Sequence, residues 1–312
     1  PGEPMGEKPL REAIYERLYA RLAPALSILP DKPEENAAST LRALWFAAAG
    51  MPRSAEQARA GELPGLDDEA LATLEASITE RLSGIPLSHL TGRQRFMGLD
   101  LLAGPQALIP RKETELLARS AIRLAQERIK QLGEALVIDV CTGSGNVALA
   151  IAHHTAGARV LAADMSPAAV ELARRNLAQL GLANRVEVRC GDLLAPFDEP
   201  QLRGQVDVLT CNPPYIASGK VESMPAEISR YEPRLAFDGG AFGLGVVLRL
   251  IQEAPSYLRK GGWLAFEVGA GQGPALLKRT RASTSFIETE AVEDERGIIR
   301  VILARRGESS AG

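Results

Sequence analysis

The sequence predicts an α/β protein in which a mainly parallel sheet, covered by helices on both faces, follows a small N-terminal helical domain. From residue 135 onward, short apolar segments alternate with amphipathic ones, as in successive βαβ units. Before residue 92, apolar residues recur at helical spacing and no segment has the alternation of a strong strand. The length of 312 residues leaves room for two domains.

Residues 1–92 are expected to form a small helical domain. Apolar residues at every fourth position from 10 to 22 predict a first helix, and a second is expected over about residues 39–49. A third helix should begin after Asp67, a good N-cap, and end at Gly84. We expect residues 1–8 to lack fixed structure, because Pro1–Pro4 precede a Met5 typical of an initiator.

Residues 93–112 are expected to form a connecting hairpin, and residues 113–312 the α/β domain. Its predicted strands are 135–140, 159–163, 185–189, 206–210, 263–268 and 298–303. Its predicted helices are 113–132, 147–153, 167–180, 245–258 and 272–280.

Composition excludes several function classes. A net charge of −3 supplies no general field for nucleic acid, so no direct nucleic-acid binding is expected. Three cysteines without a C-x-x-C pair and three histidines give no metal-ligand spacing. No apolar run reaches the roughly 18 residues of a membrane span, so we expect a cytoplasmic protein.

A glycine-containing turn joins the first predicted strand of the sheet to a helix. It runs from Asp139 through Thr142, Gly143 and Gly145 to Asn146 and permits close backbone approach to a ligand. By itself this signal is weak, because many such turns are only tight connections and the third glycine of the dinucleotide fingerprint is absent.

Two acidic residues follow the next two predicted strands. Asp164 could accept hydrogen bonds from both hydroxyls of a ribose, and Asp192 could read an adenine amino group. Singly, Asp164 could instead cap the next helix and Asp192 could occupy a turn. Together with Asp139 and the glycines they mark the carboxyl ends of consecutive strands, and the turn has no Walker lysine. The arrangement resembles the S-adenosylmethionine site of a class I methyltransferase with a Rossmann-like sheet.

The most specific signal is Asn212-Pro213-Pro214-Tyr215, directly after the fourth predicted strand. The prolines remove two amide donors, and Asn212 adds a side-chain acceptor at the strand end. Two convergent acceptors suit a planar NH₂ group, whose face could then point at a sulfonium methyl. Tyr215 could stack on the amide or cover the sulfonium. The alternative is a simple turn after a strand.

At this point the sequence resembles the NPPY methyltransferases, and specifically the PrmC/HemK family of protein-glutamine methyltransferases that modify peptide-chain release factors. The segments that carry the resemblance are residues 86–92, 96–99, 109–115, 231–240 and 261–272. The resemblance implies a release factor as partner and a G-G-Q glutamine as methyl acceptor. It also implies that residues 1–92 form a helical substrate-recognition domain, which helps to hold the protein substrate.

The resemblance also implies residue roles. Cofactor-binding residues would be Asp139, Thr142, Gly143, Gly145, Asp164, Met165, Asp192, Leu193 and Asn212. Substrate-binding residues would be Arg111, Thr114, Glu115, Pro214 and Tyr215. Asn212, the Pro213 carbonyl and Tyr215 would be catalytic.

The motif leaves other substrates open. The same corner could orient a small-molecule amine, or the cofactor's own amine could close an azetidine ring. Adenine in DNA or RNA has a similar exocyclic amine, although the acidic balance and lack of an evident recognition domain disfavour it. A non-catalytic binding module is the remaining alternative.

Overall fold

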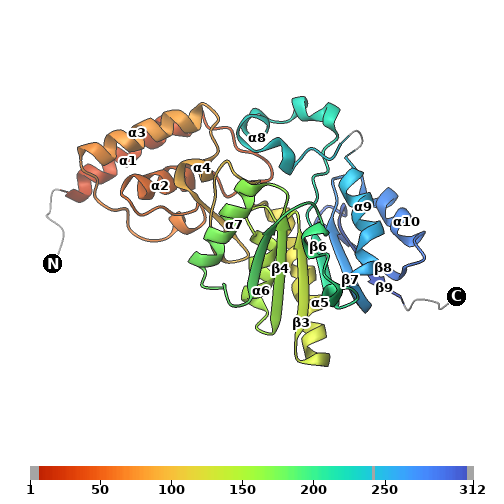
Figure 1. Cartoon of the computed structure of the whole chain (residues 1–312). Coiled ribbons are helices and arrows are strands. Elements are labelled where there is room, and N and C mark those ends of the chain that lie inside the picture. The colour runs from red at the N-terminus through yellow and green to blue at the C-terminus, as the bar shows by residue number, and fades with distance from the viewer. Residues whose placement is uncertain (1–6, 241–242, 308–312) are drawn as a thin grey trace. The chain divides into compact units, whose positions relative to one another are not determined.

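The computed structural model describes residues 7–240 and 243–307 (Figure 1). It divides into a helical unit, Pro1–Pro105 with Pro225–Tyr231, and an α/β unit, Gln106–Met224 with Glu232–Gly312. This division differs from the expected boundaries after residues 92 and 112. The hairpin packs against a neighbouring short helix of the helical unit and is grouped with it.

Within the described residues, the helical unit contains the three predicted helices, the predicted hairpin and two short α-helices that were not predicted. Its elements are α1 (Glu7–Leu22), α2 (Ala37–Ala48), α3 (Asp68–Leu82), α4 (Leu87–Thr91), β1 (Arg93–Phe96), β2 (Leu99–Leu102) and α8 (Ala226–Tyr231). The Asp67 side chain caps α3 by accepting a hydrogen bond from the Ala70 amide at 2.8 Å, as predicted. Glu7 and Lys8 lie in α1 rather than outside fixed structure, whereas the other residues of that prediction, 1–6, lie outside the described residues.

A cluster of buried charges holds α8 within the helical unit. Glu227 accepts hydrogen bonds from the Lys32 ammonium at 3.3 Å and from the Arg81 guanidinium at 3.0 Å. Glu35 lies beside both cations, and burial raises the pKa of its carboxyl. Because these pairs join positions far apart in sequence, helical periodicity gives no sign of α8 or of its place.

The α/β unit is built on a seven-stranded sheet of order β5-β4-β3-β6-β7-β9-β8. Its strands are β3 (Ala135–Val140), β4 (Ala158–Asp164), β5 (Val186–Cys190), β6 (Val206–Cys211), β7 (Leu258–Glu267), β8 (Phe286–Glu293) and β9 (Ile299–Arg306). Its helices are α5 (Glu115–Leu132), α6 (Asn146–His154), α7 (Pro167–Gln179), α9 (Gly245–Glu253) and α10 (Gly273–Arg281). The first five strands are parallel, and β9 pairs antiparallel with both neighbours.

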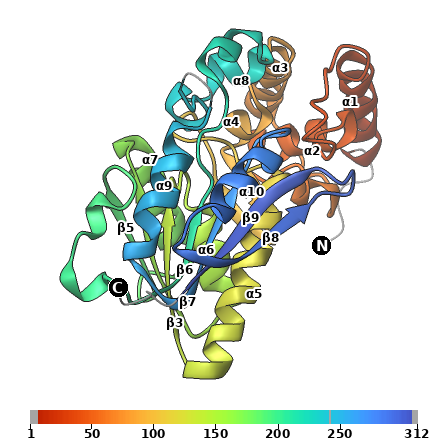
Figure 2. The same ribbon diagram turned by 90° about the vertical axis from the view of Figure 1, so that its right-hand side faces the viewer.

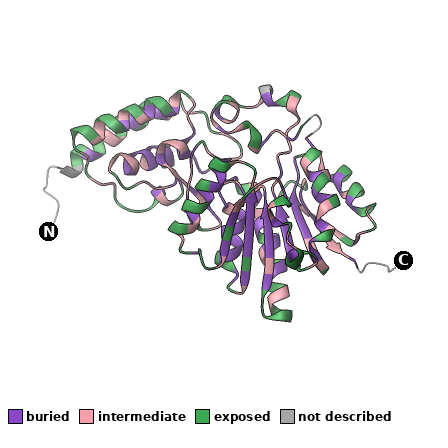
Figure 3. Ribbon diagram, viewed as in Figure 1, coloured by how far each residue is buried: buried purple, intermediate pink, exposed green. Residues whose placement is uncertain are grey.

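The strand order reverses direction at β3. The chain passes outward from β3 to β4 and β5, then returns to β6 on the other side of β3. Because parallel crossovers are right-handed, α6 and α7 cover one face and α9 the other. Figure 2 shows α10 beside β8 and β9, which it contacts. The central strands are almost wholly buried (Figure 3). Such a reversal opens a crevice at the carboxyl ends of β3, β4 and β6, where ligands bind in open α/β sheets.

The six predicted strands and five predicted helices of this unit are all present, with shifted ends. The helix expected over 245–258 ends at Glu253, because Pro255 cannot continue it. The β8 strand was not predicted. Its segment, Phe286–Glu293, carries three glutamates on an edge strand that is largely exposed, so it lacks an apolar pattern.

Candidate active site

A pocket of about 990 Å³, including its open mouth, lies at the carboxyl ends of these strands and wholly within the α/β unit. The predicted residues that line it are Arg111, Thr114, Asp139, Thr142, Gly143, Asp164, Met165, Asp192, Leu193, Asn212 and Pro214. Within the described part of the chain, Gly145, Pro213, Tyr215 and Glu115 do not line it.

Gly143 and Gly145 are each suited to the turn for a different structural reason. Gly143 has φ +56°, and a Cβ there would meet no protein atom within 4 Å, so the adjoining space is free for a ligand. Gly145 has φ +82°, and a Cβ there would lie 3.2 Å from Leu149 and 3.3 Å from Ala173. Gly143 therefore borders the pocket, whereas Gly145 lets α6 pack against α7.

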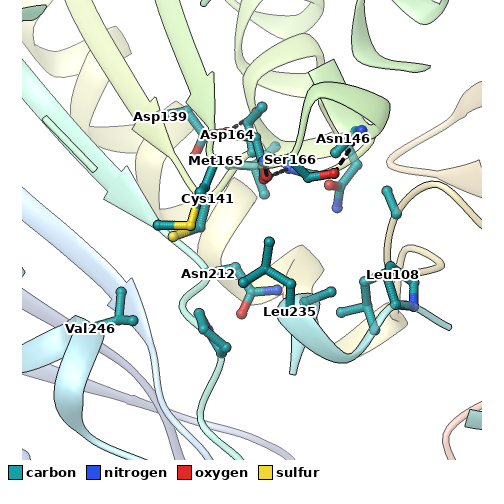
Figure 4. A pocket seen from close by; sticks show the side chains of 18 of the residues that line it. Leu108, Asp139, Cys141, Asn146, Asp164, Met165, Ser166, Asn212, Leu235 and Val246 are labelled. Atoms are coloured by element: carbon teal, nitrogen blue, oxygen red, sulfur yellow. Dashed lines mark hydrogen bonds between the residues drawn. The ribbon is translucent and has the colours of Figure 1, made fainter. Parts of the chain in front are cut away.

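Asp164 connects the end of β4 to the glycine turn (Figure 4). Its Oδ2 accepts a hydrogen bond from the Gly143 amide at 2.8 Å, and its Oδ1 accepts one from the Ser166 amide at 2.9 Å. Burial raises the pKa of the carboxyl, and these amide bonds oppose the rise. Since each carboxylate oxygen has a second lone pair, Asp164 can still accept hydrogen bonds from a ligand.

Asp139, at the end of β3, is 1% exposed. It accepts hydrogen bonds from the hydroxyls of Thr142 at 2.6 Å and Thr210 at 2.7 Å. Burial raises the pKa of Asp139 to about 6, against the opposing effect of these hydroxyls. The carboxylate therefore places a negative charge in a nearly dry corner of the pocket, where it favours a cationic ligand group.

The other predicted cofactor residues form a more open wall. Asp192 accepts a hydrogen bond from Arg249 at 2.9 Å, and its side chain is 40% exposed. Leu193 is buried with φ +45°, and Met165, also a lining residue, is half exposed. This wall offers apolar contact with one carboxylate at its edge.

Asn212, directly after β6, has one partnered and one unpartnered side-chain atom. Its Nδ2 donates a hydrogen bond to the Thr114 hydroxyl at 3.5 Å. Its Oδ1 is buried and has no hydrogen-bond partner among the described residues. Buried polar atoms are seldom unsatisfied, so Oδ1 is an acceptor available to a bound group with an N–H or O–H.

Tyr215 lies behind the pocket rather than in its wall. Its hydroxyl donates a hydrogen bond to Glu267 at 3.3 Å, and its ring lies against Gly269, where a Cβ would be 2.9 Å away. Its carbonyl accepts a hydrogen bond from Gln272 at 2.8 Å. These contacts direct the ring toward the end of β7, and Tyr215 is not among the lining residues of the pocket. Its stacking on a substrate amide or over the sulfonium stays a prediction.

The predicted substrate residues Arg111 and Glu115, near the start of α5, form different ion pairs. Arg111 forms a buried ion pair with Glu232, which also accepts a hydrogen bond from the Ile109 amide at 2.8 Å. Glu115 pairs with Arg119 at 3.1 Å, one turn along α5. Arg111 therefore contributes to the rim of the pocket, and Glu115 stabilises the start of a helix.

Several functional candidates were missed by the sequence reasoning. Cys141, Asn146 and Leu235 line the pocket (Figure 4). Glu232 pairs with Arg111 of the pocket rim, and Glu267 accepts the hydrogen bond of Tyr215. Leu235 belongs to a segment that the sequence analysis considered only for its family resemblance. The sequence gives no sign that Glu267, at the end of its strand, lies beside Tyr215.

No helix in the described ranges is long and apolar enough to cross a membrane. Nor do those ranges bring together three histidine, cysteine or acidic side chains in a geometry that could hold a metal ion.

Comparison with known proteins identifies the family. A model described as a methyltransferase domain matches residues 137–231. The chain is 42% identical over 233 residues to the release factor glutamine methyltransferase of Moorella thermoacetica, covering 74% of this chain and 79% of that one. It is 35% identical over 279 residues to the protein of the same name from Geobacter sulfurreducens, covering 89% and 93%.

Solved structures support the fold alone. The hMettl16 catalytic domain in complex with a MAT2A 3′UTR hairpin superposes with a TM-score of 0.53 at 20% identity, over 69% of this chain and 78% of that one. This likeness confirms the predicted class I methyltransferase fold. The names of the sequence relatives do not favour the small-molecule alternative. The chain belongs to the release factor glutamine methyltransferase family, a family of S-adenosylmethionine-dependent enzymes.

Proposed function

We propose that this chain transfers a methyl group from S-adenosylmethionine to the side-chain amide nitrogen of a glutamine in a peptide-chain release factor. The observation that carries the proposal is the buried, unpartnered Oδ1 of Asn212 in the wall of a pocket that also contains Asp164. A primary amide has N–H groups for such an acceptor, and a ribose has hydroxyls for such a carboxylate.

The residues of the pocket fit S-adenosylmethionine. The free space beside Gly143 admits a ligand close to the backbone, and Asp164 can accept from the ribose hydroxyls. Asp139 supplies negative charge for the cationic methionine part, while Met165 and Leu193 offer apolar contact to the adenine. When bound, S-adenosylmethionine supplies an electrophilic methyl group on a positively charged sulfur.

Asn212 and Pro213 would hold the acceptor amide. Asn212 Oδ1 accepts one N–H and the Pro213 carbonyl accepts the other, so the NH₂ plane is fixed with one face toward the donor. An amide nitrogen is a poor nucleophile because its lone pair is delocalised. Hydrogen bonds from its N–H groups to these two oxygens strengthen as positive charge develops on nitrogen, and each is worth a few kcal/mol in a dry site.

The partner would be the release factor itself. A glutamine reaches such a pocket only from an extended loop, which the G-G-Q tripeptide provides. We expect no direct nucleic-acid contact, because the net charge is −3. Since peptide-chain release takes place in the cytoplasm, the proposal locates the enzyme there.

A labelling experiment tests this function. The wild-type enzyme is incubated with methyl-labelled S-adenosylmethionine and either purified release factor or the same factor with the G-G-Q glutamine changed to alanine. Label is expected in the unmodified factor only. Equal labelling of both factors would contradict the assigned acceptor. Release of methylthioadenosine in a reaction with the donor alone would indicate cyclisation instead.

A further inference from the structure

We propose that Arg249, on α9, is a positioning residue that holds the Asp192 carboxylate in place to recognise the amino group of the adenine in S-adenosylmethionine. The inference rests on the function proposed above, whose cofactor carries this base, and assigns a role to a residue that the sequence analysis did not consider. It makes the choice of base depend on an ion pair between α9 and the turn after β5.

The turn after β5 fixes the backbone of Asp192 but not its carboxylate. The Ala195 amide donates a hydrogen bond to the Asp192 carbonyl at 3.0 Å, and the Gly191 amide donates one to the Asp164 carbonyl at 2.9 Å. An aspartate in a turn commonly accepts a hydrogen bond from an amide of that turn. Among residues 7–240 and 243–307, the Asp192 carboxylate accepts no such bond, and its side chain is 40% exposed. The turn alone therefore does not orient the carboxylate.

Arg249 supplies the missing contact. Its guanidinium donates a hydrogen bond to Asp192 Oδ2 at 2.9 Å. The same nitrogen lies 3.6 Å from Glu253, one turn further along α9, so the arginine is also held from its own helix. Val246, one turn before Arg249, lines the pocket (Figure 4). The ion pair therefore joins α9 to Asp192 at the edge of the pocket.

The ion pair leaves one oxygen of Asp192 for a ligand. With Oδ2 bonded to Arg249, Oδ1 can accept a hydrogen bond from the amino group of adenine, which has two N–H donors. A side chain that is already ordered loses less entropy on binding, so Arg249 strengthens this bond. Asp164 differs, because two backbone amides hold its carboxylate. Loss of Arg249 should therefore weaken recognition of the base and spare recognition of the ribose.

Two other roles for Arg249 predict different results. An arginine that only stabilises the fold would affect the binding of every ligand equally, and ion pairs as exposed as this one contribute little to stability. An arginine that competes with adenine for Asp192 would weaken binding, so its removal would strengthen binding. Positioning predicts that removal of Arg249 costs affinity only when the ligand carries the amino group.

The test measures base preference, defined as the ratio of two dissociation constants. Isothermal titration calorimetry gives these constants for S-adenosylhomocysteine and for its 6-deamino analogue, which has hydrogen in place of the amino group. Arg249→Met removes the charge and keeps an apolar side chain. Its matched control is Arg123→Met. Arg123 is 46% exposed against 48% for Arg249, and it also pairs with one carboxylate on another element, Glu290, and one on its own helix, Glu127.

The wild type should prefer the amino group by at least about tenfold, as for a hydrogen bond to a charged acceptor. In Arg249→Met this preference should fall below about threefold, while affinity for the deamino analogue stays within about twofold of the wild type. Asp192→Ala should abolish the preference. Arg249→Lys restores a positive charge and should recover part of it. Arg123→Met should keep the wild-type preference.

The possible failures are distinguishable. An unchanged preference in Arg249→Met, beside its loss in Asp192→Ala, would overturn the inference and leave the proposed cofactor site intact. Tighter binding of S-adenosylhomocysteine by Arg249→Met, or a wild type without any preference, would also overturn it. A wild type that shows the preference but does not methylate the release factor would support the inference and contradict only the proposed function.

Discussion

The carboxylate of Asp164 accepts a hydrogen bond from the backbone amide of Gly143 at 2.8 Å. This bond connects the end of β4 to the turn after β3, so the two neighbouring strands shape one wall of the pocket. It also fixes the carboxylate before any ligand binds, which reduces the ordering cost of binding.

Replacing Asp164 with alanine should weaken binding of S-adenosylhomocysteine. A ribose would lose its paired acceptors at a cost of about 1–3 kcal/mol, or roughly 5- to 150-fold in Kd. Isothermal titration calorimetry measures the change. The matched control is Asp68→Ala, an exposed aspartate at the start of α3, which should bind like the wild type. Equal affinity in the two variants would contradict the ribose assignment.

Replacing Gly143 or Gly145 with alanine should distinguish an effect on ligand binding from an effect on helix packing. Both positions have positive φ, which costs an alanine about 1 kcal/mol. In Gly145→Ala the new Cβ also crowds Leu149 and Ala173, so this variant should lose more thermal stability. In Gly143→Ala the Cβ occupies free space beside the pocket, so the main loss should be ligand affinity.

Thermal denaturation and S-adenosylhomocysteine titration of both glycine variants check this contrast. The reverse pattern, with affinity lost mainly at Gly145, would show that the free space beside Gly143 is not where the ligand lies.

Asp139→Asn should stabilise the protein at neutral pH. Burial raises the pKa of Asp139 to about 6 from an ordinary 3.8, so the folded state binds more protons than the unfolded state between these values. Wild-type stability therefore falls as pH rises from about 4 to 6, by about 2–3 kcal/mol in total. The neutral amide avoids this loss. Chemical denaturation should find the variant more stable at pH 7.5 with the advantage gone near pH 4; a variant destabilised at pH 7.5 would refute this.

Glu232→Ala should destabilise the α/β unit. It removes the buried partner of Arg111 and the acceptor of the Ile109 amide, and breaking a buried ion pair costs about 3–5 kcal/mol. Thermal unfolding followed by circular dichroism should show a decrease of several degrees. Glu127→Ala, which removes an exposed pair with Arg123, should change stability by less than about 1 kcal/mol. Similar melting temperatures for the two variants would argue against a structural role for Glu232.

Local patterns were sufficient to predict most of the fold. The glycine turn, Asp164 and Asn212 follow strands whose apolar runs are unmistakable, and the carboxyl ends of parallel strands meet at one edge of a sheet. Their common location in one pocket was therefore predictable before any coordinates.

The remaining features depend on contacts between distant residues. Tyr215 donates a hydrogen bond to Glu267 at the end of β7. The position of α8 depends on the hydrogen bonds of Glu227 with Lys32 and Arg81. The spacing of residues along the sequence does not indicate that these pairs form. The edge strand β8 was missed for a different reason, because a strand largely exposed to solvent need not show an apolar face.

The most direct test is a crystal structure of the enzyme with S-adenosylhomocysteine and a peptide containing G-G-Q. The account predicts that the glutamine amide nitrogen lies within about 3.2 Å of Asn212 Oδ1, with one face of the amide toward the cofactor sulfur. A complex in which this nitrogen lies farther than about 5 Å from Asn212, beyond any hydrogen bond, would contradict it.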